Sequence, residues 1–169
     1  MSPKVEQKET PVRANVIVAP SREFEPRRFH LFLAGGITNC PDWQKEMIGE
    51  LAGNGDLNMF NPRRPSFPID DPNAAPEQIA WEYKYLEECP FVLFWFSRGS
   101  LNPIVLYELG MWGNSRPDKT IFVGADPEYQ RKQDVVIQTR LARPDIVIAH
   151  SIPKLAEQVQ ETLKKLRSA

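Results

Sequence analysis

The stretch Phe91-Val92-Leu93-Phe94-Trp95-Phe96 is apolar at every position. A strand covered by apolar layers on both sides is a continuous apolar run, whereas a half-exposed strand alternates apolar with polar residues. Shorter apolar runs at residues 29–34 and 120–124 repeat this pattern on either side in the sequence. We therefore expect residues 91–96 to form the central strand of a sheet with helices on both faces.

Segments with strand and helix patterns alternate outward from this run. Strands are expected at residues 29–34, 57–60, 91–96, 120–124 and 145–149. Helices are expected from about Pro41 to Gly53, from Pro76 to Glu88, from Asn102 to Gly113 and from Pro153 to Arg167. Such alternation favours right-handed crossovers and a mostly parallel sheet in an α/β domain.

The chain divides into an arm and one domain. Residues 1–27 are polar, charged and rich in proline, which predicts a partly flexible N-terminal arm. The remainder, residues 28–169, is long enough for a single domain with its own core. The apolar segment Ala14–Val18 is the exception within the arm, and it either adds an edge strand or packs on a neighbouring subunit.

Charge and composition argue against several classes of protein. The formal net charge is −1 and the pI is near 6.2, which leaves no excess positive charge for a nucleic-acid partner. The two cysteines and two histidines have no metal-ligand spacing, so no metal is expected. The chain starts with charged residues and proline, and no apolar run is long enough for a bilayer. We expect a cytoplasmic protein without a membrane partner.

Glu108 lies within residues 103–112, the most apolar helix-like stretch of the chain. Burial of a lone carboxylate costs several kcal/mol unless it is paired or used in chemistry. Asn102 is a good N-cap for this helix, and Glu108 shares a helix face with Ile104 and Met111. Glu108 is therefore either a catalytic carboxylate or a glutamate that reaches the surface or pairs with an arginine.

Glu82 occupies a similar position in the preceding helix. It lies three residues after Ile79 and four before Leu86, on a stripe expected to face inward. If Glu82 and Glu108 converge, their repulsion should push their pKa values apart, which suits one carboxylate for attack and the other for positioning or proton transfer. The alternative is that Glu82 bonds a nearby tyrosine or arginine.

Ligands of parallel α/β sheets bind beyond the carboxyl ends of the strands. Here that rim is expected to consist of residues 35–41, 61–71, 97–103 and 125–138. Gly35-Gly36 permits close approach of a ligand to the backbone. The third glycine of a dinucleotide fingerprint and the Walker lysine are both missing, so no NAD or ATP cofactor is expected. The proline-rich segment 63–76 is long for a connection and suits a wall or lid.

Several of these pieces together resemble one known family. They are Phe32–Thr38, Pro41–Gln44, Asn61–Arg64, Trp81–Tyr83 and Tyr107–Gly110. Their order and content are similar to the nucleoside 2-deoxyribosyltransferases, especially the shorter "like" branch. The resemblance implies a flavodoxin-like three-layer domain with a five-stranded, mostly parallel sheet.

The resemblance also implies roles for individual residues. Glu108 matches the nucleophile, and Glu82 matches the residue that orients the sugar, which is usually aspartate. Asn102 stands where classical members carry the aspartate that contacts the base, and it has no titratable proton to give. Thr38 stands where phosphate-binding relatives use arginine, which favours an unphosphorylated nucleoside. The residues expected to bind substrate are Gly35, Gly36, Ile37, Asp42, Trp43, Asn61, Asn102 and Gln138.

The function implied is transfer of 2-deoxyribose between nucleobases through a covalent deoxyribosyl-glutamate intermediate. Its partners would be a 2′-deoxynucleoside and a free nucleobase, without a cofactor. The family builds its sites across subunit contacts, so we expect a homo-oligomer in which a partner chain supplies Asp134 or Gln138. The alternatives are a deoxynucleoside N-glycoside hydrolase and a non-catalytic nucleotide-sensing domain.

Overall fold

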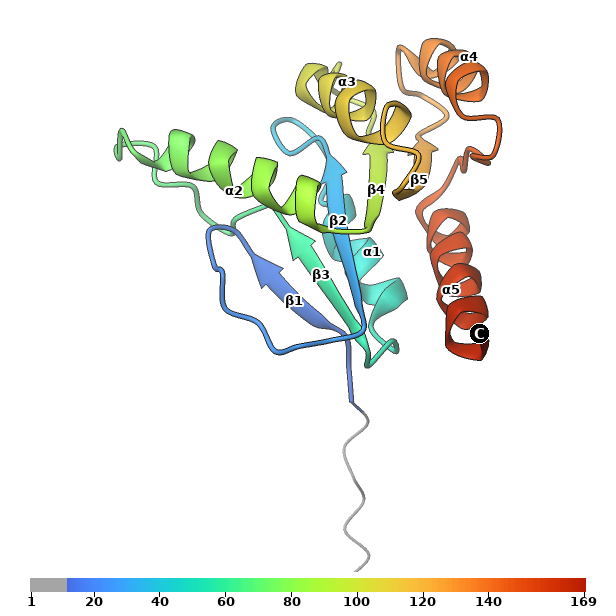
Figure 1. Ribbon diagram of the computed structural model, residues 1–169. Coiled ribbons are helices and arrows are strands. Elements are labelled where there is room, and N and C mark those ends of the chain that lie inside the picture. The colour runs from blue at the N-terminus through green and yellow to red at the C-terminus, as the bar shows by residue number, and fades with distance from the viewer. Residues whose placement is uncertain (1–11) are drawn as a thin grey trace, which may run out of the picture.

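Five parallel strands form the middle layer of the computed structural model, which describes residues 12–169 (Figure 1). The strand order is β1-β3-β2-β4-β5. The strands are β1 (Asn15–Val18), β2 (Phe29–Gly35), β3 (Leu57–Asn61), β4 (Phe91–Phe96) and β5 (Thr120–Ala125). The helices are α1 (Trp43–Leu51), α2 (Ala74–Glu88), α3 (Pro103–Glu108), the π-helical η1 (Leu109–Asn114), α4 (Lys132–Ala142) and α5 (Ile152–Ser168).

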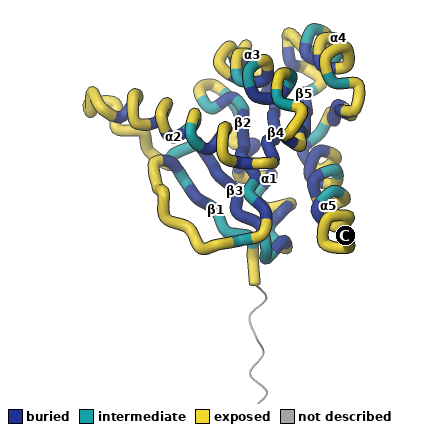
Figure 2. The backbone as a smooth tube through the Cα atoms, in the orientation of Figure 1, coloured by how far each residue is buried: buried dark blue, intermediate teal, exposed yellow. Residues whose placement is uncertain are grey.

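The helices cover both faces of the sheet, which confirms the predicted α/β, flavodoxin-like three-layer fold. Helices α2, α3 and α4 lie on one face, and α1 and α5 lie on the other (Figure 1). Strand β4 contributes Val92, Phe94 and Phe96 to the first core, and Phe91, Leu93 and Trp95 to the second. Strands β2 to β5 are buried along most of their length, whereas the edge strand β1 is mostly half-buried (Figure 2). Two apolar layers therefore explain why residues 91–96 contain no polar residue.

The fifth strand comes from a different segment than the one expected. Residues 15–18 pair with β3, so the edge-strand alternative for Ala14–Val18 is the one observed. The strand predicted at 145–149 was wrong, because this segment makes only a single bridge, between Ala149 and Gly124. Ile146 and Ile148 are buried while Val147 is 71% exposed. The apolar residues of this segment thus pack against the core without a hydrogen-bonded ladder.

One helix was not expected, and two expected helices differ in their extent. The unexpected helix is α4, which begins at Lys132 within the rim segment 125–138. Helix α2 begins at Ala74, before the proline at 76. The helix expected from Asn102 to Gly113 is α-helical only to Glu108 and continues as the π-helical η1. No helix among residues 12–169 is long and apolar enough to cross a bilayer.

The connections after β2 and β4 leave the sheet on opposite sides. The chain runs from β2 to α1 on one face and from β4 to α3 on the other. A crevice forms at such a switch point, beyond the carboxyl ends of the two neighbouring strands. This is where the topology places a ligand site.

Candidate active site

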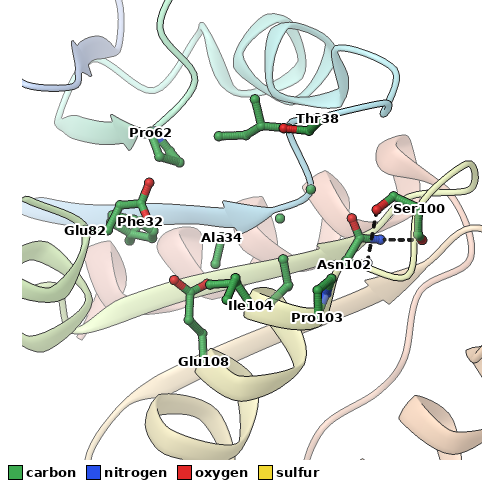
Figure 3. A pocket seen from close by; sticks show the side chains of 14 residues that line it. Phe32, Ala34, Thr38, Pro62, Glu82, Ser100, Asn102, Pro103, Ile104 and Glu108 are labelled. Carbon is green, nitrogen blue, oxygen red and sulfur yellow. Dashed lines mark hydrogen bonds between the residues drawn. The ribbon is translucent and has the colours of Figure 1, made fainter. Parts of the chain in front are cut away.

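A cavity of about 240 Å³ opens at this switch point. Its walls are the loop after β2, the loop after β4 and the start of α3, and α2 contributes one side chain (Figure 3). Phe32 and Ala34 line it from β2, on the same face of the sheet as α2 and α3. The cavity therefore has an apolar floor, where charges are screened less than in water.

Glu108 lies at the last residue of α3, and its carboxylate points into the cavity (Figure 3). Ile104, one turn earlier, lines the cavity too, so the two residues share a helix face as expected. The carboxylate has no hydrogen-bond partner among the described residues. Burial, followed by the negative charge of Glu82, raises the pKa of Glu108 from its ordinary value of 4.5 to about 8. Glu108 is thus a desolvated carboxyl group that the fold leaves unpaired.

Directly after Glu108 the helix widens into the π-helical turn η1. This turn buries Leu109, Trp112 and Gly113 against the core. A Cβ on Gly113 would lie 2.6 Å from Leu109 Cδ1, so the glycine lets the Leu109 side chain pack directly against the turn. Single π turns inside helices are frequent at functional sites. Here the turn anchors the helix in the core just beyond the carboxylate.

Glu82 reaches the cavity from α2 and is held by a glutamine. Gln78 Nε2 donates to Glu82 Oε1 at 2.7 Å and to the carbonyl oxygen of Pro62 at 2.8 Å. Burial raises the pKa of Glu82, while the hydrogen bond from Gln78 and the charge of Arg64 act against that rise. The expected stripe through Ile79 was wrong, since Ile79 is 65% exposed. Glu82 instead lies at the edge of a buried stripe that includes Gln78.

The two carboxyl groups approach one cavity from different helices (Figure 3). Their environments differ, because Glu82 accepts a hydrogen bond and Glu108 accepts none among the described residues. A hydrogen bond to a carboxylate favours its charged form, and the charge of Glu82 then disfavours a second charge on Glu108. Such a pair suits chemistry at a carbon that becomes positively charged.

Asn102 lines the cavity, but its side chain is already engaged by the protein. Its Nδ2 donates to the carbonyl oxygens of Ser97 and Ser100, both at 3.1 Å, and its Oδ1 accepts from Cys40 Sγ at 3.3 Å. Asn102 occupies the N-cap position of α3, as expected, but with φ 50° its side chain makes no cap hydrogen bond. Asparagine tolerates this left-handed backbone, which turns its amide away from the helix start.

The glycine pair after β2 accommodates the protein's own side chains. A Cβ on Gly35 would lie 2.3 Å from Trp43 Cζ2, and one on Gly36 would lie 1.8 Å from Asn102 Oδ1. Trp43 Nε1 also donates to the carbonyl oxygen of Gly36 at 3.0 Å. Both glycines line the cavity, so they bring its wall close to Trp43 on one side and Asn102 on the other.

Comparison with known proteins now identifies the chain. A family model described as "Nucleoside 2-deoxyribosyltransferase like" matches residues 28–129, which is more than half of the chain. The chain belongs to this family. The match runs from the start of β2 past α3, and so includes every residue that lines the cavity. A comparison with curated proteins finds no match.

Membership of the deoxyribosyltransferase-like family agrees with the resemblance seen in the sequence, and the structure shows where each expected residue lies. The expected residues that line the cavity are Glu82, Glu108, Gly35, Gly36, Ile37 and Asn102. Four others do not line it. Asp42 caps α1 by accepting from the Lys45 amide at 3.1 Å, Trp43 is buried behind the glycine pair, Asn61 is buried at the end of β3, and Gln138 is exposed on α4.

Two residues of the site were missed by sequence reasoning. Gln78 could have been found, because it precedes Glu82 by four residues and such pairs are neighbours on a helix. Arg63 entered the sequence analysis only as part of the piece Asn61–Arg64, without a role of its own. Its position directly after Asn61-Pro62, at the carboxyl end of β3, was the available signal. Within residues 12–169, no three His, Cys, Asp or Glu side chains gather as metal ligands do.

Proposed function

We propose that this protein transfers 2-deoxyribose from one nucleobase to another by a double displacement at C1′. The observation that carries the proposal is the convergence of Glu82 and Glu108 on one apolar-floored cavity. Membership of the nucleoside 2-deoxyribosyltransferase-like family supports it.

In the first step the Glu108 carboxylate attacks C1′ of a 2′-deoxynucleoside. A bond forms between a carboxylate oxygen and C1′ as the C1′–N bond breaks, and the electron pair leaves with the base, which takes a proton from solvent. Glu108 must be ionised to attack. Its raised pKa makes the ionised form a stronger nucleophile than an exposed glutamate.

In the second step a ring nitrogen of the incoming base attacks C1′ from the opposite side. The ester bond breaks, and the Glu108 carboxylate is released. Two inversions give net retention at C1′. Glu82, held by Gln78, is placed to bond a sugar hydroxyl and to stabilise positive charge on the ring.

The cavity lining favours a nucleoside without a phosphate. No Lys, Arg or His lines the cavity within the part of the chain that the structure describes, and Thr38 occupies the loop after β2. Two carboxyl groups would also repel a phosphate placed near them. The neutral walls formed by Ile37, Pro103 and Val105 suit a flat base and an uncharged sugar.

The test is incubation of the purified protein with single 2′-deoxynucleosides, with and without a second base, followed by chromatography of the products. A new deoxynucleoside that forms only with the second base supports the proposal. Release of free sugar in either case would indicate the hydrolase, and binding without turnover would indicate a sensing domain. The Glu108→Gln variant should do neither reaction, whereas Glu87→Gln, an exposed change on α2, should match wild type.

A further inference from the structure

Arg63 is bonded to the loop after β2 more extensively than any other described side chain. Only 21% of its side chain is exposed. Its guanidinium donates to four oxygens: Nη1 to Pro41 O and Gln44 Oε1, each at 3.0 Å, and Nη2 to Ile37 O at 3.3 Å and Cys40 O at 3.1 Å. Asp42 adds an ion pair to Nε at 3.8 Å. Three backbone carbonyls of one short loop thus accept from a single guanidinium.

The geometry requires arginine in particular. A guanidinium holds five N–H donors in a rigid fork, whereas a lysine ammonium is a single flexible point. The backbone of Arg63 is fixed in turn, because Asn61 Oδ1 accepts from its amide at 3.0 Å. Asn61 and Asp42, which were expected to bind substrate and lie outside the cavity, both contact Arg63 instead.

The hydrogen bonds continue from this loop to the helix that carries Glu108. Cys40, whose carbonyl oxygen accepts from Arg63, donates through its thiol to Asn102 Oδ1. Asn102 then donates to Ser97 and Ser100 and directly precedes the first residue of α3. One continuous chain of contacts therefore joins the loops that follow β3, β2 and β4.

We propose that Arg63 is a positioning residue that holds the cavity wall formed by residues 36–38 and, through Cys40 and Asn102, the start of the Glu108 helix. The part of this inference that concerns turnover rests on the proposed function. Both amide hydrogens of Asn102 are used within the protein, so a base can meet its side chain only as a donor to Oδ1. Asn102 is then primarily a link between loops.

Activity gives the first test. Arg63→Ala should lower kcat about 10- to 100-fold, because small misplacements of reacting groups have effects of this size. Arg63→Lys keeps the positive charge without the planar set of donors, so its kcat should stay close to that of Arg63→Ala. Added guanidinium ion should partly restore the activity of Arg63→Ala. Arg98→Ala is the matched control, since Arg98 is an exposed rim arginine that pairs with Glu128. It should behave as wild type.

The pH profile separates positioning from a direct electrostatic role. Arg63 does not line the cavity, so the pH midpoint of kcat/KM should stay in place in Arg63→Ala while kcat falls. Full activity of Arg63→Lys, or a midpoint shift in Arg63→Ala that Arg63→Lys reverses, would overturn the proposal.

A second test needs no substrate. The Cys40 amide donates to Ile37 O at 3.3 Å within the loop that Arg63 holds. Its hydrogen exchange should accelerate about 10-fold or more in Arg63→Ala and Arg63→Lys, and should not change in Arg98→Ala. Unchanged exchange would overturn the proposal. If wild type turns over no deoxynucleoside but exchange of the Cys40 amide still accelerates in the Arg63 variants, the positioning role of Arg63 is supported. Only the proposed function is then refuted.

Cys40 provides an independent check on the link to Asn102. Cys40→Ser keeps a donor toward Asn102 Oδ1 and should retain most activity, whereas Cys40→Ala removes that donor and should lower kcat several-fold. Equal activity of the serine and alanine variants would show that the thiol contact has no positioning role, and would overturn that part of the inference.

Discussion

Glu82 and Glu108 extend from two different helices into one cavity, and the charge of Glu82 contributes to the raised pKa of Glu108. The pair is asymmetric. Gln78 donates to Glu82 and favours its ionised form, while burial leaves Glu108 as the group that holds a proton near neutral pH. The pKa of both carboxyl groups is raised, but only Glu82 has a hydrogen bond that opposes the rise, and the following predictions use this difference.

Removal of the Glu108 carboxylate should abolish transfer. We expect Glu108→Ala to lower kcat by about 10⁴ or more, as for other covalent nucleophiles. Intact-mass measurement of wild type with a 2-deoxy-2-fluoro nucleoside should show one sugar adduct, and peptide mapping should place it on Glu108. Near-normal turnover by the alanine variant would rule out this residue as the nucleophile.

The pH dependence should follow the ionisation of Glu108. Because only the carboxylate attacks, kcat/KM should rise with pH and level off above about 8. Glu82→Gln removes a neighbouring negative charge, so the pKa of Glu108 should fall and the midpoint should move to lower pH, although the maximum rate decreases. Glu87→Gln is the control. A midpoint that does not move in Glu82→Gln would show that the two groups are not coupled.

The free energy of unfolding should fall as pH rises, whereas kcat/KM increases. The folded pKa of Glu108 is raised, so the folded state keeps a proton that the unfolded state loses near pH 4.5. Stability from this group is therefore lost as pH rises from about 4.5 to about 8. Glu108→Gln should be more stable than wild type above pH 8, by on the order of a few kcal/mol. Denaturant unfolding of both proteins at pH 5 and pH 9 measures the difference in stability between Glu108→Gln and wild type. An equal difference at the two pH values would contradict the prediction.

Aspartate at position 102 would add the titratable proton that the family resemblance associates with this place. The structure predicts a cost, because a carboxylate there would face the carbonyl oxygens of Ser97 and Ser100 in place of two amide hydrogens. Asn102→Asp should lose about 1–3 kcal/mol of stability at neutral pH and regain part of it at acid pH. Thermal unfolding across pH provides the measurement. A variant as stable as wild type at pH 7 would show that the amide does not hold the loop.

Exposed apolar side chains on the outer face of α2 and α3 lead us to expect self-association of the chain. Ile79, Tyr83 and Tyr107 are all more than half exposed there. We propose a homo-oligomer of at least two chains through this face, which should bury more than ~1,000 Å². Light scattering at micromolar concentration should give at least twice the chain mass.

The matched variants are Tyr107→Asp, which should dissociate the assembly, and Val147→Asp, an exposed position outside α2, α3 and α4, which should not. Gln138 is exposed on α4, so a site role for it requires a partner chain. A fully active monomer would refute both the contact and that role.

The sequence alone determined the three-layer fold and singled out Glu108 as a carboxylate within an apolar helix. The apolar run 91–96 can be stable only between two apolar layers, which makes it an interior strand, although the middle strand of the sheet is β2. Glu108 is the one acidic residue in its apolar helix stretch. These inferences depend on residues close together in the chain, whose periodicity directly reports the surface that they face. The family resemblance, confirmed over residues 28–129, followed from motifs of the same local kind.

Only the tertiary structure decided which segment completes the sheet and what Asn102 and Arg63 do. Residues 15–18 and 145–149 are both short and mainly apolar, but only the first forms a hydrogen-bonded ladder, with β3, whereas the second makes one bridge to β5. Asn102 bonds Cys40, which lies 62 positions earlier, and Arg63 bonds Ile37, 26 positions earlier. Such partners meet only after the strands have paired, since the carboxyl ends of parallel strands bring distant loops to one edge.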